Sequence, residues 1–152
     1  MALREEFTNQ LKTSMKAGDA ARTSTLRMIL AKLKDTDIAA RKSPQDPGVP
    51  EEQIVSMLRG MAKSRGESVT LYRQGNRPEL AQAERDEITV IQSFMPKQMS
   101  DEEAKAAVAG VIAAVGATSV KDMGKVMAEL KAKFAGQMDM GKAGGIVKAL
   151  LG

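Results

Sequence analysis

The lysines in the last third of the chain are the residues best suited to bind an anion. From Lys105 onward there are seven lysines and three acids, and all nine arginines of the 152-residue chain lie before residue 95. Lysine side chains and the backbone N–H groups at helix starts can contact phosphates without reading bases. The glycine-rich segment Gly141–Gly145, which contains Lys142, would let the backbone approach a polyanion closely. The alternative is that these lysines form a solvated face, with Asp101/Lys105 and Glu129/Lys133 as helical i,i+4 pairs.

A second concentration of polar residues lies near the middle of the chain. Its members are Arg65, Glu67, Tyr72, Arg77 and Glu84, with Glu87 one helical turn beyond Glu84. Carboxylates and guanidinium groups that face each other across two helices can form a site, in which a carboxylate could serve as a general base. The same residues can instead form an ion-pair network that ties a helical bundle together.

The residue types missing from the sequence exclude several kinds of site. The chain has no Cys, His or Trp, which excludes a disulfide, a Cys/His zinc site, a Ser-His-Asp triad and a cysteine nucleophile. The segment Gly141–Gly145 also lacks the spacing of a phosphate-binding P-loop. Any catalysis would have to use carboxylates, Lys, Tyr, Ser or Thr. We expect no catalytic residue, no bound metal and no cofactor in this chain.

Apolar periodicity predicts four helices before residue 95. The first, ending near Gly18, carries the stripe Leu3, Phe7, Leu11 and Met15. The second begins after the N-cap residue Asp19 and carries Leu26, Ile29, Leu30, Leu33 and Ile38. Prolines in segment 43–50 predict a loop, after which Pro50 starts a third helix that ends near Gln74. The fourth predicted helix carries Leu80, Ala83, Ile88, Ile91 and Phe94.

Three further helices are expected after the break at Met95 and Pro96. The Ser100 side chain should accept from the N–H of Glu103 and start a helix that ends at Gly116. Ser119 is expected to start the next helix, which ends near Phe134, and Asp139 to cap the last. No window alternates apolar and polar residues as a strand would. The predicted fold class is therefore all-α, with an N-terminal bundle of about four helices (residues 1–95) and a small C-terminal three-helix domain (residues 96–152).

Charge and hydropathy set expectations about location. The net charge is +4 and the isoelectric point is about 9.4, which is compatible with an anionic partner without demanding one. The charged residues Arg4, Glu5 and Glu6 follow the N-terminus with no apolar segment of a signal peptide behind them, and no run reaches the roughly 18 apolar residues of a membrane span. We expect a cytoplasmic protein that does not contact a membrane.

Several motifs resemble those of the YqeY family, also called GatB/YqeY-domain proteins. They are Arg65–Ser68, Tyr72, Gly75–Leu80, Glu84, Phe94–Ser100, Val115–Ser119 and Asp122–Met127. The resemblance covers essentially the whole chain. Its most specific piece, Asp122–Met127 followed by Gly141–Ala143, is also similar to the tail of the B subunit of the amidotransferase that amidates misacylated Glu-tRNA or Asp-tRNA.

This resemblance implies an all-helical fold, with tRNA or another structured RNA as the candidate ligand. It also implies a family-level association with carbon–nitrogen ligase activity that uses glutamine as the amide donor. The chain has neither the cradle domain nor the amidase Ser-Ser-Lys constellation in which that chemistry takes place, so we do not expect it to be catalytic alone. DNA is not an expected partner.

The expected function is that of a tRNA- or RNA-binding accessory protein. The residues expected to meet the RNA backbone are Lys125, Lys142, Lys148, Gly141, Gly144 and Gly145. The alternative is a protein-interaction module that docks on an amidotransferase or another tRNA enzyme without touching RNA.

Overall fold

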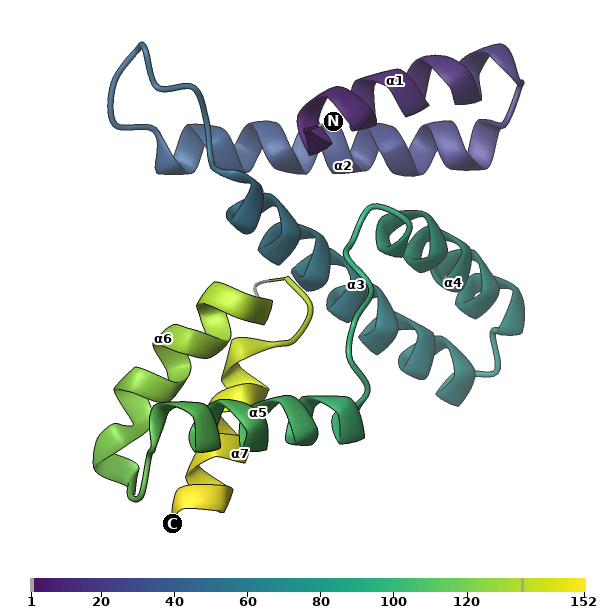
Figure 1. Cartoon of the computed structure of the whole chain (residues 1–152). Helices are drawn as coiled ribbons and strands as arrows, with labels where there is room; N and C mark the ends of the chain where they lie inside the picture. Colours follow the sequence, from purple (N-terminus) through teal and green to yellow (C-terminus); the bar gives the residue numbers. More distant parts are fainter. Residues whose placement is uncertain (1, 135) are drawn as a thin grey trace. The chain divides into compact units, whose positions relative to one another are not determined.

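The computed structural model describes residues 2–134 and 136–152, and these residues form helices and loops without a strand (Figure 1). The predicted all-α fold class is therefore confirmed for this part of the chain. The chain divides into two compact units, Met1–Met95 and Pro96–Gly152.

The first unit contains four helices, whose ends follow local sequence signals. They are α1 (Leu3–Lys16), α2 (Ala20–Ala40), α3 (Glu51–Gln74) and α4 (Pro78–Gln92). The Asp19 side chain caps α2 by accepting from the N–H of Arg22 at 3.0 Å. Helix α4 begins with Pro78, which lacks the N–H that would be unpaired at that position.

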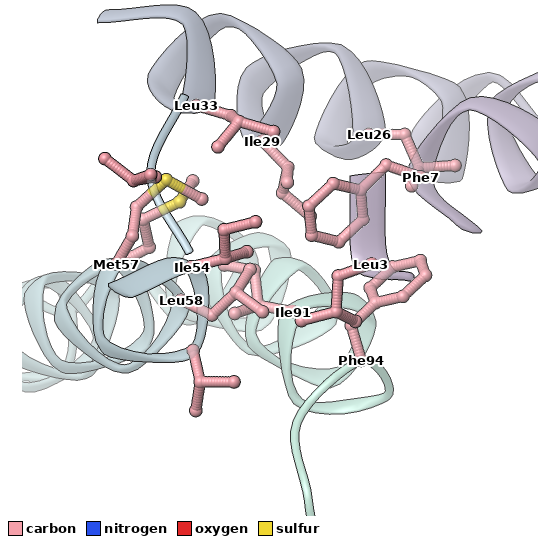
Figure 2. Packing of buried hydrophobic residues seen from close by; sticks show 13 residues of the cluster. Leu3, Phe7, Leu26, Ile29, Leu33, Ile54, Met57, Leu58, Ile91 and Phe94 are labelled. Carbon is pink, nitrogen blue, oxygen red and sulfur yellow. The ribbon is translucent and has the colours of Figure 1, made fainter. Parts of the chain in front are cut away.

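The core of the first unit joins all four helices (Figure 2). Phe7 of α1 and Phe94, just after α4, form an edge-to-face pair with ring centroids 5.0 Å apart. The largest fully buried side chains around them are Leu26, Ile29, Ile54, Leu58 and Ile91. The two ends of this unit's sequence therefore meet in one core, which accounts for its folding as a unit.

The stripe predicted for α1 departs from the structure at its end. Met15 is 53% exposed, whereas the neighbouring Ser14 is 3% exposed. A spacing of four residues drifts by about 40° around the helix at each step, so Met15 has rotated away from the face that Leu3 begins. The Ser14 hydroxyl lies inside instead and shares a 2.8 Å hydrogen bond with Thr23 of α2.

Helix α2 also departs from its predicted stripe at its C-terminal end, where Ile38 lies five residues, or roughly 140°, beyond Leu33. Ile38 is 58% exposed, contrary to the predicted stripe, and Asp37 takes the inward position. Arg4 of α1 donates to Asp37 through both terminal nitrogens and also to the carbonyl oxygen of Val49. This contact fastens the start of α1 to the loop that precedes α3.

Helix α4 buries a set of residues that differs in part from the one predicted. Leu80 is 40% exposed and Ala83 is also exposed, whereas Ala81 is 1% exposed. Helix α4 packs most extensively against α3, and Ala81 and Ile91 are the residues it buries. The positions predicted for Ile91 and Phe94 are confirmed.

The second unit contains three α-helices and one 3₁₀ turn. They are α5 (Asp101–Val115), η1 (Val120–Asp122), α6 (Met123–Phe134) and α7 (Met140–Leu151). The expected start of the middle helix at Ser119 is wrong by a few residues, because the 3₁₀ turn comes between Ser119 and α6. Val108, Val126, Leu130 and Val147 are fully buried where the three α-helices pack together.

The helices differ from membrane spans in length and hydropathy. No single helix among the described residues is long and apolar enough to cross a membrane. Helix α5 and segment Val120–Phe134 meet the requirement only as a pair, and they are bent by 93° where they join.

Candidate nucleic-acid interface

The second unit carries eight lysines and six acids, and three of those acids are in the first turn of α5. The Ser100 side chain caps that turn by accepting from the N–H of Glu103 at 3.1 Å. The acidic residues therefore gather at the start of α5, while most of the lysines are spread along η1, α6 and α7. A polyanion would meet least repulsion on α6 and α7.

Lys142 and Lys148 lie on the solvent side of α7. Both are exposed, and Ala143 and Val147 are buried on the opposite side. At 100° per residue they lie roughly 60° to either side of Gly145 and roughly 9 Å apart along the helix axis. Gly145 is exposed, and a Cβ added there would have no neighbour within 4 Å. The two ammonium groups therefore flank a bare stretch of helix backbone.

The start of α7 is already occupied by a carboxylate of the chain itself. The Asp139 side chain accepts from the N–H groups of Gly141 at 2.8 Å and Lys142 at 3.4 Å. These donors are the ones that a phosphate would use at a helix N-terminus. An anion that approaches α7 must therefore interact mainly with lysine side chains, because the negative charge of Asp139 stands at the helix start.

Gly144 differs in its surroundings from Gly141 and Gly145. It is half-buried, and a Cβ added there would lie 3.6 Å from Cε of Met123, at the start of α6. Lys125 and Lys142 are each two residues away from this contact. Two residues correspond to a rotation of roughly 200°, so Lys125 and Lys142 each lie away from the side on which α6 and α7 approach at this point.

Lys125 also lies close to an acid of its own helix start. The pKa of Asp122 is lowered, chiefly because its carboxylate accepts a hydrogen bond from the N–H of Thr118 at 3.0 Å, with a smaller contribution from the charge of Lys125. Asp122 therefore stays ionised and offsets part of the positive potential around Lys125. Lys142 and Lys148, by contrast, have no side-chain partner among residues 2–134 and 136–152.

Of the two predicted i,i+4 pairs, the described residues form the Glu129–Lys133 pair of α6 and not the Asp101–Lys105 pair of α5. The ammonium of Lys133 lies 3.3 Å from the carboxylate of Glu129, four residues earlier. Both side chains are substantially exposed, so this pair contributes little to stability. It also reduces the charge that Lys133 can offer to an anion.

The polar residues predicted as a second site lie along α3, α4 and the turn between them. Within the described chain, Arg65 is the only one of Arg65, Glu67, Tyr72, Arg77 and Glu84 whose side chain forms an ion pair or hydrogen bond. Its partner is Glu87, with Nε 2.7 Å from Oε2. Glu67 and Arg77 are exposed, and Tyr72 and Glu84 are half-buried. The structure therefore pairs Arg65 of α3 with Glu87 of α4 rather than bringing the five residues together.

Arg65 also lies beside a hollow between α2 and α3. Its guanidinium donates to the carbonyl oxygen of Met61 at 3.3 Å, and its side chain helps to line the hollow. The position of Glu87, one turn beyond Glu84, indicated that it would share a face with Glu84. The choice between the two acids as partner depends on how α4 is rotated against α3.

Comparison with known protein families gives a match over nearly the whole chain. A family model described as Yqey-like protein matches residues 4–151. No curated protein matches the chain.

Proposed function

The chain belongs to the YqeY family of Yqey-like proteins, and from this premise we propose that its C-terminal unit binds the phosphate backbone of structured RNA, with tRNA as the candidate ligand. The supporting observation is that Lys142 and Lys148 are exposed on the side of α7 opposite the buried Ala143 and Val147, with Gly145 between them. Lys125 is an exposed lysine of α6 in the same unit. The similarity of Asp122–Met127 and Gly141–Ala143 to an amidotransferase tail supports tRNA as the ligand.

The binding proposed here depends on side-chain charge and on close approach of the backbone. Lysines act as point charges that displace counterions from phosphates, and they confer little base specificity. Gly145 lets the RNA backbone come near α7, because no side chain stands between Lys142 and Lys148. The whole chain has only four aromatic residues, which disfavours recognition by stacking of single-stranded bases.

Measuring tRNA affinity at several salt concentrations tests this proposal. The variant Lys125→Glu/Lys142→Glu/Lys148→Glu should bind far more weakly, and Lys-to-Ala versions should lower the salt slope by roughly one for each phosphate that is no longer neutralised. The matched control reverses Lys12, Lys34 and Lys63, which are exposed lysines of the first unit, and changes the net charge equally. Flat salt dependence, or equal loss of affinity in the control, would refute the proposal.

A second measurement identifies the ligand. RNA that copurifies with the full chain should be enriched in tRNA and depleted in preparations of the triple-reversal variant. Enrichment of unstructured RNA instead would contradict the preference for structured RNA.

The second candidate function is docking on an amidotransferase or another tRNA enzyme without direct RNA contact. The observation that favours it is the outward side of α5, where Ala106, Ala109, Gly110 and Ala113 are exposed and uncharged. Such a surface suits close packing against another helix. A protein partner that survives nuclease treatment in a pull-down would support docking, and an empty pull-down would count against it.

We do not propose ligase activity for the chain alone. The family-level association is with carbon–nitrogen ligases that use glutamine, but the chain lacks the cradle domain and amidase constellation described above. Purified chain incubated with glutamine, ATP and Glu-tRNA should form no Gln-tRNA, and measurable turnover would show this expectation to be wrong.

A further inference from the structure

The outward side of α2 carries a set of residues with no function in the core of the first unit. Ser24, Arg27, Ala31 and Asp35 are exposed, and Ile38 is the 58% exposed residue at its C-terminal end. At 100° per residue these five positions lie within roughly 80° of one another, so they form one face. In the sections of chain that the structure describes, the side chains of Arg27 and Asp35 have no ion-pair or hydrogen-bond partner.

Two hollows flank this face. The first, of about 550 Å³, lies where α1 turns into α2, and its lining includes Met15, Gly18, Ser24, Arg27, Met28 and Ala31. The second, of about 930 Å³, lies between α2 and α3, and its lining includes Met28, Ala31, Asp35, Met57, Gly60 and Met61. Met28 and Ala31 line both hollows, so the two hollows adjoin the same stretch of α2. Methionine side chains adapt readily to the shape of a partner.

The charges on this face are arranged symmetrically about Ala31. Arg27 lies four residues before Ala31 and Asp35 four residues after it, so the three residues form one ridge of the helix surface. When such ridges of two helices pack side by side in opposite directions, the basic end of each meets the acidic end of the other. The face is thus complementary to a second copy of itself, which is the requirement for a two-fold symmetric interface.

We infer that this face joins two copies of the chain, with α2 of one copy antiparallel to α2 of the other and Ala31 at the two-fold axis. Arg27 of each copy then pairs with Asp35 of the other copy. Ala31 permits close approach of the two helices, because its side chain is a single methyl group.

The same symmetry also accounts for the exposed Ile38. Ile38 and Ser24 lie seven residues to either side of Ala31, so Ile38 of one copy faces Ser24 of the other. Ser24 lies in the lining of the first hollow, together with Met15 and Met28. Met15 is 53% exposed, and association would remove both Met15 and Ile38 from water. Burial of apolar area is the main driving force for such association.

Charge exchange provides the test. The full chain is examined by sedimentation equilibrium from micromolar to several hundred micromolar concentration, and we expect a reversible dimer that weakens as salt is added. The variants Arg27→Asp and Asp35→Arg should each raise the dimer dissociation constant by tenfold or more. An equimolar mixture of the two variants should recover association, because one variant then presents two carboxylates at the interface and the other presents two guanidinium groups.

The chain that carries both Arg27→Asp and Asp35→Arg should also dimerise, since exchange of the charges preserves their complementarity. Lys12→Glu, on α1, is the control that leaves association unchanged. If either single reversal unfolds the chain, Ala31→Glu replaces it, because two carboxylates at the two-fold axis must also weaken the dimer. The inference is overturned if the chain stays monomeric at every concentration. This holds even if the monomer binds another protein through this face. A dimer that is insensitive to Arg27→Asp, Asp35→Arg and Ala31→Glu overturns it as well.

Discussion

Arg4 and Asp37 lie 33 residues apart in the sequence and form a bidentate ion pair, with Nη1 of Arg4 2.7 Å from Oδ2 of Asp37 and Nη2 2.7 Å from Oδ1. The same carboxylate accepts from the N–H of Val49 at 2.8 Å, and Nη2 of Arg4 donates to the carbonyl oxygen of Val49 at 2.9 Å. One arginine thus joins α1, the end of α2 and the loop before α3. The planar guanidinium suits this role, because it offers several donors in a fixed geometry.

Replacement of Asp37 by Asn should destabilise the first unit by about 1–3 kcal/mol at neutral pH, since the hydrogen bonds to Asp37 involve charged groups. The Arg4 guanidinium, followed by the Val49 N–H, holds the pKa of Asp37 below its ordinary value. The ionised carboxylate of Asp37 therefore gives its full stabilisation above the unfolded-state pKa of about 3.9. This stabilisation is lost as the pH falls through the lower pKa that Asp37 has in the folded chain. Urea unfolding followed by circular dichroism should show that the difference in free energy of unfolding between wild type and Asp37→Asn becomes smaller in acid. A difference that stays constant down to pH 2 would contradict this linkage.

Gly48→Ala should also destabilise the first unit, by about 1–3 kcal/mol. Gly48 has φ +101°, and an added Cβ would lie 2.5 Å from Nη2 of Arg4. The control is Gly66→Ala within α3, where an added Cβ would meet nothing within 4 Å. This substitution should stabilise the helix by about 0.5–1 kcal/mol, because Ala has a higher helix propensity than Gly. Thermal melts of the two variants should therefore shift in opposite directions.

Asp139 provides a prediction about the proposed RNA surface. Asp139→Asn keeps an N-cap oxygen for Gly141 and Lys142 but removes the negative charge, so stability should change little while affinity for tRNA rises. Asp139→Ala should lose about 1 kcal/mol of stability because the cap is gone. Parallel melting and tRNA-binding measurements separate the two effects. Equal tRNA affinity of Asp139→Asn and wild type would show that α7's N-terminus lies outside the binding surface.

The Arg65–Glu87 pair should couple α3 to α4. A double-mutant cycle with Arg65→Ala and Glu87→Ala should give a coupling free energy of about 0.5–1.5 kcal/mol, since the side chains are only 17% and 30% exposed. The matched cycle uses Arg65→Ala with Glu84→Ala and should give no coupling. Similar coupling in both cycles would mean that Glu84 and Glu87 share the guanidinium in solution.

Helix positions in this chain follow from short-range signals in the sequence. The capping by Asp19 and Ser100, the proline before α3 and the period of the apolar residues act over a few residues, so the sequence predicts them. The Glu129–Lys133 pair was predicted for the same reason, because residues four apart lie on one face of a helix, although Asp101 and Lys105 have the same spacing and do not pair in the described chain. The family motifs spread over the chain likewise identified the YqeY family from sequence alone.

The tertiary structure alone decided which polar side chains of different helices pair with each other. Arg4 reaches Asp37, and Arg65 reaches Glu87 rather than Glu84, because the rotation of each helix depends on packing across the whole core. A spacing of four residues drifts around a helix, which is why Met15 turns outward, whereas Ile38 lies five residues, or roughly 140°, beyond the buried Leu33. Contacts between distant segments depend on these rotations, and no local pattern in the sequence specifies them.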